Sequence, residues 1–474
     1  MPNHGVYVSE QATAVSTPVV ADSGIPFVVG TAPAHAAASP AKANVPVVVT
    51  SWNEAVEKLG FSYDWKTYTL CEFMYSHFQL FGCQPVVFCN VLDAAKMQED
   101  MAAEEYPVSD HKAAIPFEAI NDENLTVQNG EAPLEKDADY SVLYDEAEGV
   151  CVIELLSSGT AYDADTLTIS GKKVTPGAVV ETDIVAGLQA VEMCMSMVGT
   201  IPDLICAPGW SHTTTVAAVM ATKAASINGL FQAKALIDMD CGESGVRQYS
   251  DAVQAKNDGN FVDENQVLCW PMLTLGGYKF HHSTQLAGLM AQVDTGNGGC
   301  PYESPSNKNY QMDGCCLEDG TEVNLTLEQA NMLNANGIVT ALNFMSSGWT
   351  CWGNYTACYP ANTDVKDYFI PVSRMFDWVC NTVVRTFWSK LDKPMNRRLI
   401  DTILDTCNIW LNGVVGSGYL LGARAEMLDS ENPLTDLMAG IIKIHIYMTP
   451  PSPAQEIDFI LEYDTSYVTS ALQA

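Results

Sequence analysis

Basic residues are scarce in this sequence: 23 Lys and Arg stand against 57 Asp and Glu in 474 residues, a formal net charge of −34. Such an acidic surface repels nucleic acid phosphates and anionic lipid headgroups, so we expect neither direct nucleic acid binding nor membrane insertion. Long apolar runs are missing too, because no stretch approaches the roughly 20 residues needed to cross a bilayer. The longest candidate, residues 441–448, contains Lys443 and His445 and alternates like a β-strand.

Signals for secretion and for disulfide bonding are also missing. Residues 1–14 have no basic segment followed by an apolar one, so we expect no signal peptide. The 15 cysteines are scattered without framework spacing. The sequence therefore predicts folding in a reducing cytoplasm, with free thiols acting as small core residues.

Catalytic and cofactor motifs are equally hard to find. Ser211 and His212 are adjacent but no Gly-x-Ser-x-Gly elbow surrounds them, so they are expected to begin a helix. Three nearby glycines form no dinucleotide fingerprint and follow a helix: Gly413, Gly416 and Gly418. A metal site could be imagined from His281, His282, Cys300, Cys315 and Cys316, but no CxxC or His-x-x-x-His spacing supports it. We expect no enzyme, no metal and no cofactor.

Apolar residues, at 47%, are abundant, and the chain is long enough for three or four domains. The segments 25–29, 45–49 and 85–91 are expected to be buried strands, with a helix capped by Ser51 and a capping box completed by Glu54. Residues 181–349 alternate strands (202–208, 233–238, 267–272) with helices (213–227, 282–293, 327–336), which predicts a mostly parallel sheet covered by helices.

Residues 93–180 have a different character. They hold 19 acidic and 5 basic residues, and short alternating segments are separated by turn signals such as Asn-Gly and Glu-Gly. This pattern predicts a solvated, β-rich module inserted into the α/β chain.

The C-terminal region, 350–474, begins with two amphipathic helices, one starting near Pro371 and one ending at Gly413. Two alternating strands follow, separated by Pro-Pro-Ser-Pro. An isolated strand pair is marginal in water and its edges template further pairing. The apolar face and edge of this strand pair must therefore be covered. Residues 25–29 or 86–91 of the same chain could cover them, or terminal strands of neighbouring subunits could do so, including the alternating residues near the N-terminus. The residues concerned are Val6, Tyr7, Val8, Ile442, Ile444, Ile446, Ile457, Phe459 and Leu461.

A basic stretch stands out in this acidic chain. Residues 374–398 hold two acids and six bases, which are Arg374, Arg385, Lys390, Lys393, Arg397 and Arg398. Spacing of eleven residues puts Arg374 and Arg385 on one helix face, away from the apolar stripe. This surface is either a set of local ion pairs or a docking surface for an acidic partner.

Four segments resemble the tail sheath proteins of contractile phages and phage-tail-like bacteriocins. They are GVYVSEQATAVSTPVVADSGIPFVVGTAP (5–33), WTCWGNYTACYP (349–360), NRRLIDTILDTCNIWLNGVVGSGYLLGARAEM (396–427) and LTDLMAGIIKIHIYMTPPSPAQEIDFILEYD (434–464). The C-terminal segment is the most specific, and the middle, 93–349, matches in layout more than in motif. Asn354 and Tyr355 stand where the family more usually has Arg and Thr.

The resemblance implies an α/β multidomain chain with a discontinuous α+β core formed by both chain ends, around an inserted β-rich module and an inserted α/β domain. The expected divisions are an N-terminal linking arm (1–22), the N-terminal segment of the core (23–92), the acidic β insertion (93–180), the α/β domain (181–349) and the C-terminal segment of the core with its strand arm (350–474).

The resemblance also implies a function and partners. Subunits would form stacked hexameric rings and a helical polymer around an inner tail tube protein, linked by strands exchanged between neighbours. Contraction, triggered by a baseplate, would drive the tube through a target envelope, with the basic region 374–398 facing the tube. Baseplate and tail terminator proteins are further implied partners. The particle would assemble in the bacterial host cytoplasm and belong to a virion tail or an extracellular particle.

Two other classes remain open from the residues alone. A static capsid or surface-layer subunit shares the acidity and the β insertion, but it need not keep flexible arms at both ends. An α/β hydrolase would need a polar cluster at the strand C-termini, and no motif of suitable spacing supplies it.

Overall fold

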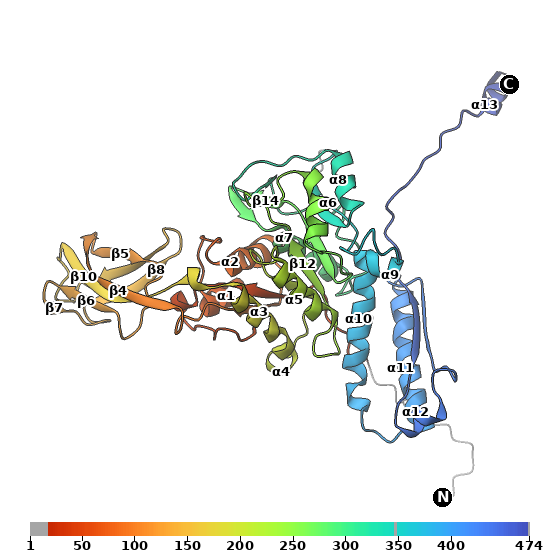
Figure 1. Ribbon diagram of the computed structural model, residues 1–474, viewed down its shortest axis with the longest axis horizontal. Helices are drawn as coiled ribbons and strands as arrows, with labels where there is room; N and C mark the ends of the chain where they lie inside the picture. The colour runs from red at the N-terminus through yellow and green to blue at the C-terminus, as the bar shows by residue number, and fades with distance from the viewer. Residues whose placement is uncertain (1–17, 346–347, 473–474) are drawn as a thin grey trace, which may run out of the picture.

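The computed structural model describes residues 18–345 and 348–472. The molecule is elongated, with a β-rich module at one end, a helix-covered sheet in the middle and two long helices at the other end (Figure 1). Three separate clusters of buried apolar side chains correspond to these regions.

An eight-stranded sheet forms the centre, in the order β18-β17-β13-β12-β11-β1-β3-β2, and only the outer strands β2 and β18 run antiparallel to their neighbours. The parallel strands are buried along their whole length, which explains why most of their residues are apolar. The strands are β1 (Pro26–Gly30), β2 (Val47–Val49), β3 (Val86–Asn90), β11 (Leu204–Cys206), β12 (Lys234–Asp238), β13 (Gln266–Cys269), β17 (Ile338–Leu342) and β18 (Thr350–Trp352).

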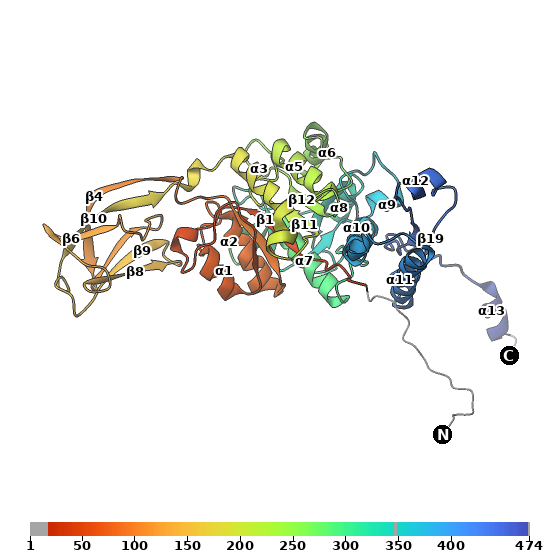
Figure 2. The ribbon, with the colours of Figure 1, turned by 90° about the horizontal axis from the view of Figure 1, so that it is seen from below.

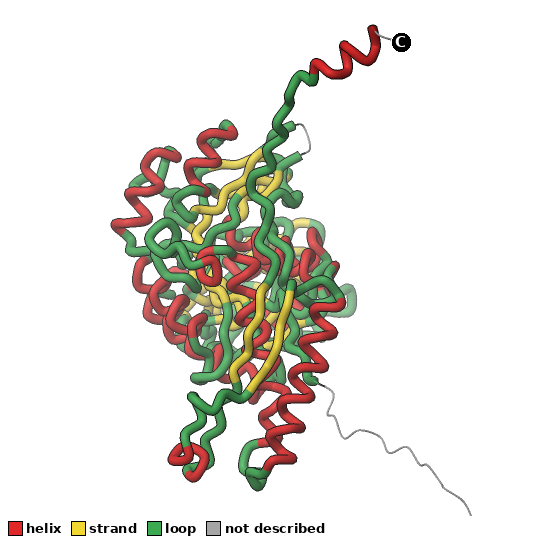
Figure 3. The backbone as a smooth tube through the Cα atoms, turned by 90° about the vertical axis from the view of Figure 1, so that its right-hand side faces the viewer, coloured by secondary structure: helices red, strands yellow, loops and turns green. Residues whose placement is uncertain are grey.

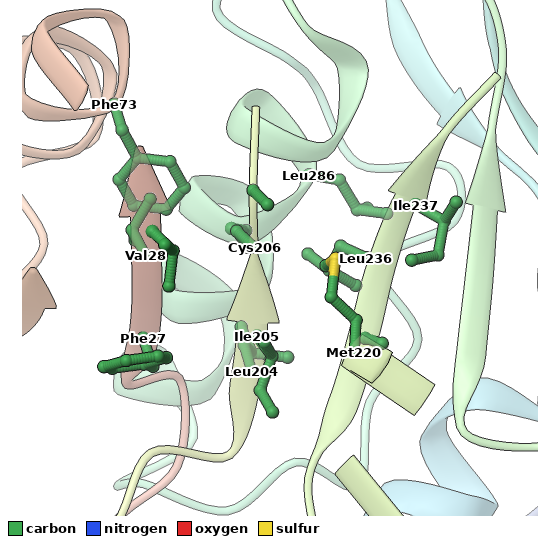
Figure 4. Close-up of a cluster of buried hydrophobic side chains, with 14 of the residues drawn as sticks. Phe27, Val28, Phe73, Leu204, Ile205, Cys206, Met220, Leu236, Ile237 and Leu286 are labelled. Atoms are coloured by element: carbon green, nitrogen blue, oxygen red, sulfur yellow. The ribbon is translucent and has the colours of Figure 1, made fainter. Parts of the chain in front are cut away.

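Helices cover both faces of this sheet. Figure 2 shows α3 and α5 on one side and α1, α2 and α7 on the other. In the core, Phe27 lies in register with Ile205, and Met220 of α5 and Leu286 of α7 add side chains from the two helices (Figure 4). The covering elements are α1 (Trp52–Leu59), α2 (Thr69–Met74), the π-helix η2 (Tyr75–Phe81), α3 (Glu181–Gln189), α4 (Cys194–Met197), α5 (Thr214–Ala225), α6 (Tyr249–Asp258) and α7 (His282–Gly296), with the 3₁₀ turns η1 (Ala34–Ala36), η3 (Pro176–Ala178) and η4 (Ala190–Met193).

The cap of α1 differs in one detail from the sequence prediction. The Ser51 hydroxyl accepts from the backbone N–H of Glu54 at 3.3 Å, as expected for an N-cap. The Glu54 carboxylate, however, accepts from the backbone N–H and the hydroxyl of Thr50, both at 2.8 Å. The predicted capping box is therefore wrong by one residue, because Thr50 offers two donors to the same oxygen.

The β-rich module is a seven-stranded sheet in the order β7-β6-β10-β4-β5-β9-β8, and all its pairings are antiparallel. One face of its strands fills a separate core that includes Ile153 and Leu167, and the other faces outward with most of the acids. The strands are β4 (Gln98–Ser109), β5 (Lys112–Pro116), β6 (Thr126–Asn129), β7 (Ala132–Pro133), β8 (Tyr140–Asp145), β9 (Val150–Leu155) and β10 (Thr166–Val174).

Two short helices, α8 and α9, pack on β17 and on α10, respectively. A small three-stranded sheet, β15-β14-β16, accompanies the central sheet. It interrupts the long surface loop expected between residues 294 and 319. These elements are β14 (Met272–Leu275), β15 (Tyr278–Phe280), β16 (Gly314–Cys316), α8 (Leu327–Asn334) and α9 (Val365–Tyr368).

The C-terminal region pairs two long helices with a two-stranded sheet, β19-β20 (Figure 3). The apolar stripes of the helices meet in a third core that includes Met375, Trp378 and Leu411. An extended segment then leads away from the rest of the chain to α13 (Figure 1). The elements are α10 (Ile370–Phe387), η5 (Trp388–Lys390), α11 (Arg397–Gly416), β19 (Gly422–Glu426), α12 (Leu434–Met438), β20 (His445–Thr449) and α13 (Thr465–Leu472).

The mixed α/β class is confirmed. Residues 23–92 contribute β1, β2 and β3 to the same sheet as the strands of residues 181–349, and residues 350–474 contribute β18 to it and Cys351 and Ile370 to its core. Strand β1 is buried on both faces and needs a parallel neighbour on each side, which β3 and β11 supply. Residues 18–22 join the C-terminal helices: Ala21 belongs to their core.

Candidate functional site

The β19-β20 sheet carries an exposed strand edge whose direction follows from its hydrogen bonding. Ala425 of β19 stands opposite Ile446 of β20. The Asn408 side chain of α11 accepts from Ala425 N at 2.8 Å and donates to Ala425 O at 2.9 Å, so the backbone groups of Ala425 point away from β20. In an antiparallel ladder the partner residue then also points its N–H and C=O outward. The backbone groups of Ile446 thus face the outer edge of β20, whereas Asn408 blocks a section of the outer edge of β19.

The side chains of the same strand are used within the subunit. Ile444, Ile446 and Met448 pack against the core of α10 and α11. Their apolar face is therefore covered internally by the two helices, and neither residues 25–29 nor residues 86–91 provide the cover. What remains available for pairing is the backbone edge.

The second predicted strand, residues 457–463, does not pair within the described chain, so the expected hairpin is wrong. Pro450, Pro451 and Pro453 lack backbone N–H groups and hold the connection extended. Ile457, Phe459 and Leu461 are 70%, 86% and 95% exposed. A run of large apolar side chains this exposed marks a surface that contacts another molecule.

The base of this segment, residues 451–456, forms one wall of a cleft of about 890 Å³, and α8 and the 302–308 loop form other walls. The Tyr355 hydroxyl donates to Gln455 Oε1 at 2.6 Å, and the ring of Tyr359 lies 4.2 Å from that of Tyr355. The extended segment is therefore anchored at one end and leaves the subunit beyond Gln455. The predicted pairing residues Val6, Tyr7 and Val8 lie outside the described residues.

The six basic residues that were predicted to form one surface lie in different environments in the structure. Lys393, Arg397 and Arg398 are exposed at the turn between α10 and α11 and at the start of α11, and Lys390 is half-buried beside them. Arg385 pairs with Asp22 at 3.2 Å. Exposed apolar side chains, Trp388 and Leu391, lie at the same tip.

Arg374 does not belong to this surface, and its prediction is wrong. It is 3% exposed, and its guanidinium donates to Asp203 at 2.7 Å and to Asp294 at 2.5 Å. Burial raises the pKa of Asp294, while the charge of Arg374 opposes that effect. The signal missed in the sequence was that Arg374 lies four residues before Trp378, on the side of α10 that packs against the chain.

A second buried ion pair lies close by. Lys234 Nζ is 2.9 Å from Asp377 Oδ2, and both side chains are almost fully buried. Together the two clusters join α10 to β12, to the start of β11 and to the end of α7. These ion pairs fix the position of the C-terminal helices on the central sheet, because a buried charge without its partner is strongly destabilising.

The imagined metal site does not form. His281 pairs with Glu72, His282 with Tyr310 and the Pro271 carbonyl, and Cys300 with Met375. Within residues 18–345 and 348–472, no group of three or more His, Cys, Asp or Glu is arranged to hold a metal. The fifteen cysteines are free thiols, and all but Cys380 are buried. None of the described helices combines the length and the apolar character that a membrane span requires.

Comparison with known proteins places the chain among subunits of contractile particles. It is 25% identical to the tail sheath protein of Burkholderia phage BcepMu, over 98% of this chain and 97% of the relative. It is 22% identical to the tail sheath protein of Escherichia phage P2, over 68% of this chain and 78% of the relative. No family model matches.

Solved structures with the same fold are sheaths as well. The sheath of the extracellular contractile injection system PVC in its contracted state aligns with a TM-score of 0.60 at 14% identity, over 98% of this chain and 99% of that one. The contracted helical sheath of the anti-feeding prophage aligns with a TM-score of 0.58 at 16% identity, over 97% and 99%. The class defined by these relatives and by the fold is a structural subunit of a contractile tail or injection system. In sequence and in fold, the chain is similar to contractile tail sheath proteins over almost its whole length.

Proposed function

We propose that this chain polymerises into stacked hexameric rings around an inner tail tube, and that contraction of the resulting sheath drives the tube through a target cell envelope. The proposal depends chiefly on one observation: the C-terminal segment carries an exposed apolar face, and the outer edge of β20 carries outward backbone groups in the same subunit. The C-terminal segment of one copy of the chain can form main-chain hydrogen bonds with the free edge of β20 in another copy. No nucleotide is consumed, because the energy is the difference between two packings of the same subunits.

In this proposal the C-terminal segment of one subunit adds to the β20 edge of a neighbour, and residues near the N-terminus add a further strand. Ile446 belongs to the accepting strand β20, and Ile442 and Ile444 lie just before it. Ile457, Phe459 and Leu461 belong to the donated strand. Such links are main-chain hydrogen bonds and stay intact while the packing between subunits changes. Baseplate and tail terminator proteins would contact the ends of the polymer, and assembly would take place in the host cytoplasm.

The donated-strand proposal is tested with two matched triple variants of the purified protein. In I457S/F459S/L461S the apolar face is lost, and we expect no tubular polymers in negative-stain micrographs. In E456Q/D458N/E462Q the opposite face changes, and polymers should form as in wild type. Urea unfolding of both variants should match that of wild type, because residues 456–462 are exposed. Normal tubes from the serine variant would contradict the proposal.

The N-terminal strand is tested by deleting residues 1–17. Residues 18–22 are kept because Val19 N and Ala21 N donate to Thr386 and Thr382 of α10 at 3.0 Å, and Trp378 donates to Ala21 O at 2.8 Å. The truncated subunit should fold normally but fail to link rings. If it polymerises like wild type, the N-terminal residues do not donate a strand.

We further propose that the exposed bases at the α10–α11 tip dock on the inner tube. Charge at the rim of an interface sets register and association rate more than affinity. The variant K393Q/R397Q/R398Q should lose co-sedimentation with tubes of the same particle at low salt, and its difference from wild type should shrink at raised salt, which screens the same charges. The variant K42Q/K96Q/K112Q removes three exposed charges elsewhere and should bind normally. Equal tube binding by both variants would place the docking surface elsewhere.

A further inference from the structure

A crevice opens in the central sheet at the point where the strand order reverses. The chain leaves β1 toward β3 on one side, whereas it leaves the neighbouring strand β11 toward β12 on the other. In open α/β sheets, ligands bind at the carboxyl ends of the strands at this switch point, because the departing connections leave a gap there. Figure 4 shows β1 and β11 side by side and pointing the same way.

The crevice is a cavity of about 820 Å³, a size typical of small-molecule sites. Its wall is built from residues at or directly beyond the ends of four parallel strands: Thr31, Gly209, Asp238 and Cys269. Both α5 and α7 begin at this wall, after Thr213 and His281. The positive ends of these two helix dipoles therefore act on the cavity.

A buried carboxylate fixes a histidine in the wall. Glu72 of α2 is 1% exposed and accepts from the backbone N–H of His281 at 2.6 Å and from its Nδ1 at 2.7 Å. Burial lowers the pKa of His281, but the charge and hydrogen bond of Glu72 outweigh it and raise the pKa to about 9. The imidazole is thus a cation at neutral pH, with Nε2–H as its second donor. That nitrogen lies beside Gly209, about 3.8 Å from where a Cβ would stand.

Four carboxylates line the cavity, those of Glu72, Asp238, Asp240 and Glu318, and all four are hydrogen-bonded or ion-paired within the protein. Asp240 Oδ1 accepts from the backbone N–H of Gly242 at 2.8 Å. Asp238 accepts from Ser211 Oγ, from Ser283 N and from Ser283 Oγ. Glu318 pairs with Lys66 at the rim and accepts from Lys279 through its carbonyl. These acids therefore have partners within the protein.

Two tryptophans in the wall have donors without acceptors. Trp65 is 6% exposed, and the indole Nε1 atoms of Trp65 and Trp210 are buried with no hydrogen-bond partner in the described chain. A buried donor left unpaired costs about 1–3 kcal/mol, so a native protein normally supplies an acceptor. Trp65 packs against Tyr278 and Phe280, both at 4.9 Å between ring centroids, whereas the half-buried ring of Trp210 offers flat apolar surface to a ligand.

We propose that this crevice binds a small organic anion, whose carboxylate or phosphate oxygens accept from His281 Nε2 and the indole N–H groups and whose apolar portion lies against Trp210. The bound ligand stabilises the folded subunit and undergoes no reaction. Lys279 at the rim, whose Nζ donates to the Glu318 carbonyl, adds positive charge, whereas the charge of Lys66 is balanced by Glu318.

The test uses the full-length protein with three anionic probes, inorganic phosphate, AMP and benzoate, and with adenosine and benzyl alcohol as uncharged counterparts. Binding is followed by tryptophan fluorescence and by the unfolding temperature. We expect saturable binding of at least one anion at millimolar concentration and none of its uncharged counterpart. No saturable binding of any of the three anions would overturn the proposal.

Two variants separate the site from general effects. W210F removes one indole donor with little change of volume, and H281Q removes the cation; each should weaken anion binding at least about tenfold, the value of one charged hydrogen bond. W388F changes an exposed tryptophan at the α10–α11 tip and should bind like wild type. Since H281Q also disturbs Glu72, W210F keeps the test valid if H281Q folds poorly. Unchanged affinity in W210F would overturn the site. If H281Q abolishes polymerisation while no anion binds wild type, the crevice is a contact between subunits and the proposal falls.

Discussion

Arg374 lies at the centre of the joint between the C-terminal helices and the central sheet, with Asp203 Oδ2 2.7 Å from its Nη2. The same nitrogen donates to Asp294, whose side chain is fully buried. Asp203 in turn accepts from the backbone N–H of Ile25, just before β1. One guanidinium therefore holds α10, α7 and the entry to the first strand in place.

Replacing Arg374 with methionine should lower the free energy of unfolding by about 3–5 kcal/mol, because two buried carboxylates lose their counter-charge. Urea unfolding of the monomer measures this. The matched control is Arg385→Met on the same helix: its partner Asp22 is largely exposed, so the loss should stay below about 1 kcal/mol. Equal losses in the two variants would show that the buried cluster has no special role.

The pairing of His281 with Glu72 predicts a pH dependence. The pKa is about 9 in the folded chain and about 6.5 unfolded, so the stabilisation is complete below pH 6.5 and is lost as the pH rises through 9. It amounts to about 3 kcal/mol at most. Unfolding of wild type and H281Q, compared between pH 6 and pH 9.5, should show a difference that shrinks as the pH rises. The comparison cancels Lys256, whose pKa burial lowers to about 8. A pH-independent difference would contradict the ion pair.

His77 predicts the opposite behaviour at acid pH. It is fully buried, neither ring nitrogen has a hydrogen-bond partner in the described chain, and burial lowers its pKa to about 3. Stability should therefore fall as the pH drops below 6.5, by up to about 1.4 kcal/mol per unit.

His77→Leu keeps the volume and removes both unpaired nitrogens, so the free energy of unfolding at pH 7 should rise by about 1 kcal/mol. The gain should grow between pH 6.5 and pH 5. Thermal unfolding at several pH values measures it, with His35, whose pKa burial also lowers, unchanged in both proteins. A loss of stability at pH 5 would show that the stacking of His77 on Phe73, 4.4 Å apart, outweighs the unpaired nitrogens.

The hydrogen bond from Tyr355 to Gln455 should control how readily the C-terminal segment detaches. Tyr355→Phe removes a bond of about 1 kcal/mol, so proteolysis beyond residue 450 should be roughly fivefold faster while global stability changes little. Tyr359→Phe keeps the ring that packs on Tyr355 and should cleave at the wild-type rate. If Tyr355→Phe also cleaves at the wild-type rate, the cleft does not anchor the segment.

The sequence was sufficient for the elements whose pattern is local. Residues 25–29 are an uninterrupted apolar run, residues 233–238 are apolar except for Lys234 and Asp238, and both segments form buried parallel strands. The helix stripes around Met375 and Leu411 likewise meet in one core. Period and burial are properties of a single segment, so they can be seen without its partners.

What the sequence could not show is which segments meet. The sequence predicted a solvent-exposed Arg374, because the two aspartates that pair with it are 171 and 80 residues away in the chain. Likewise Glu72 and His281, 209 residues apart, pair across two helices, and neither lies in a motif. The predicted C-terminal hairpin failed for a related reason: the partner of β20 is β19, which is short and carries two charges, Arg424 and Glu426.

The contacts of residues 19–21 with α10 have a mechanical meaning. Val19 and Ala21 lie along the helix and are held by Thr386, Thr382 and Trp378, so a pull on the N-terminal side loads several hydrogen bonds together. A force on residues 19–21 therefore acts on α10, and the ion pair between Arg374 and Asp203 connects α10 to the start of β11 in the central sheet. The subunit can thus resist a pulling force on its N-terminal side without unfolding.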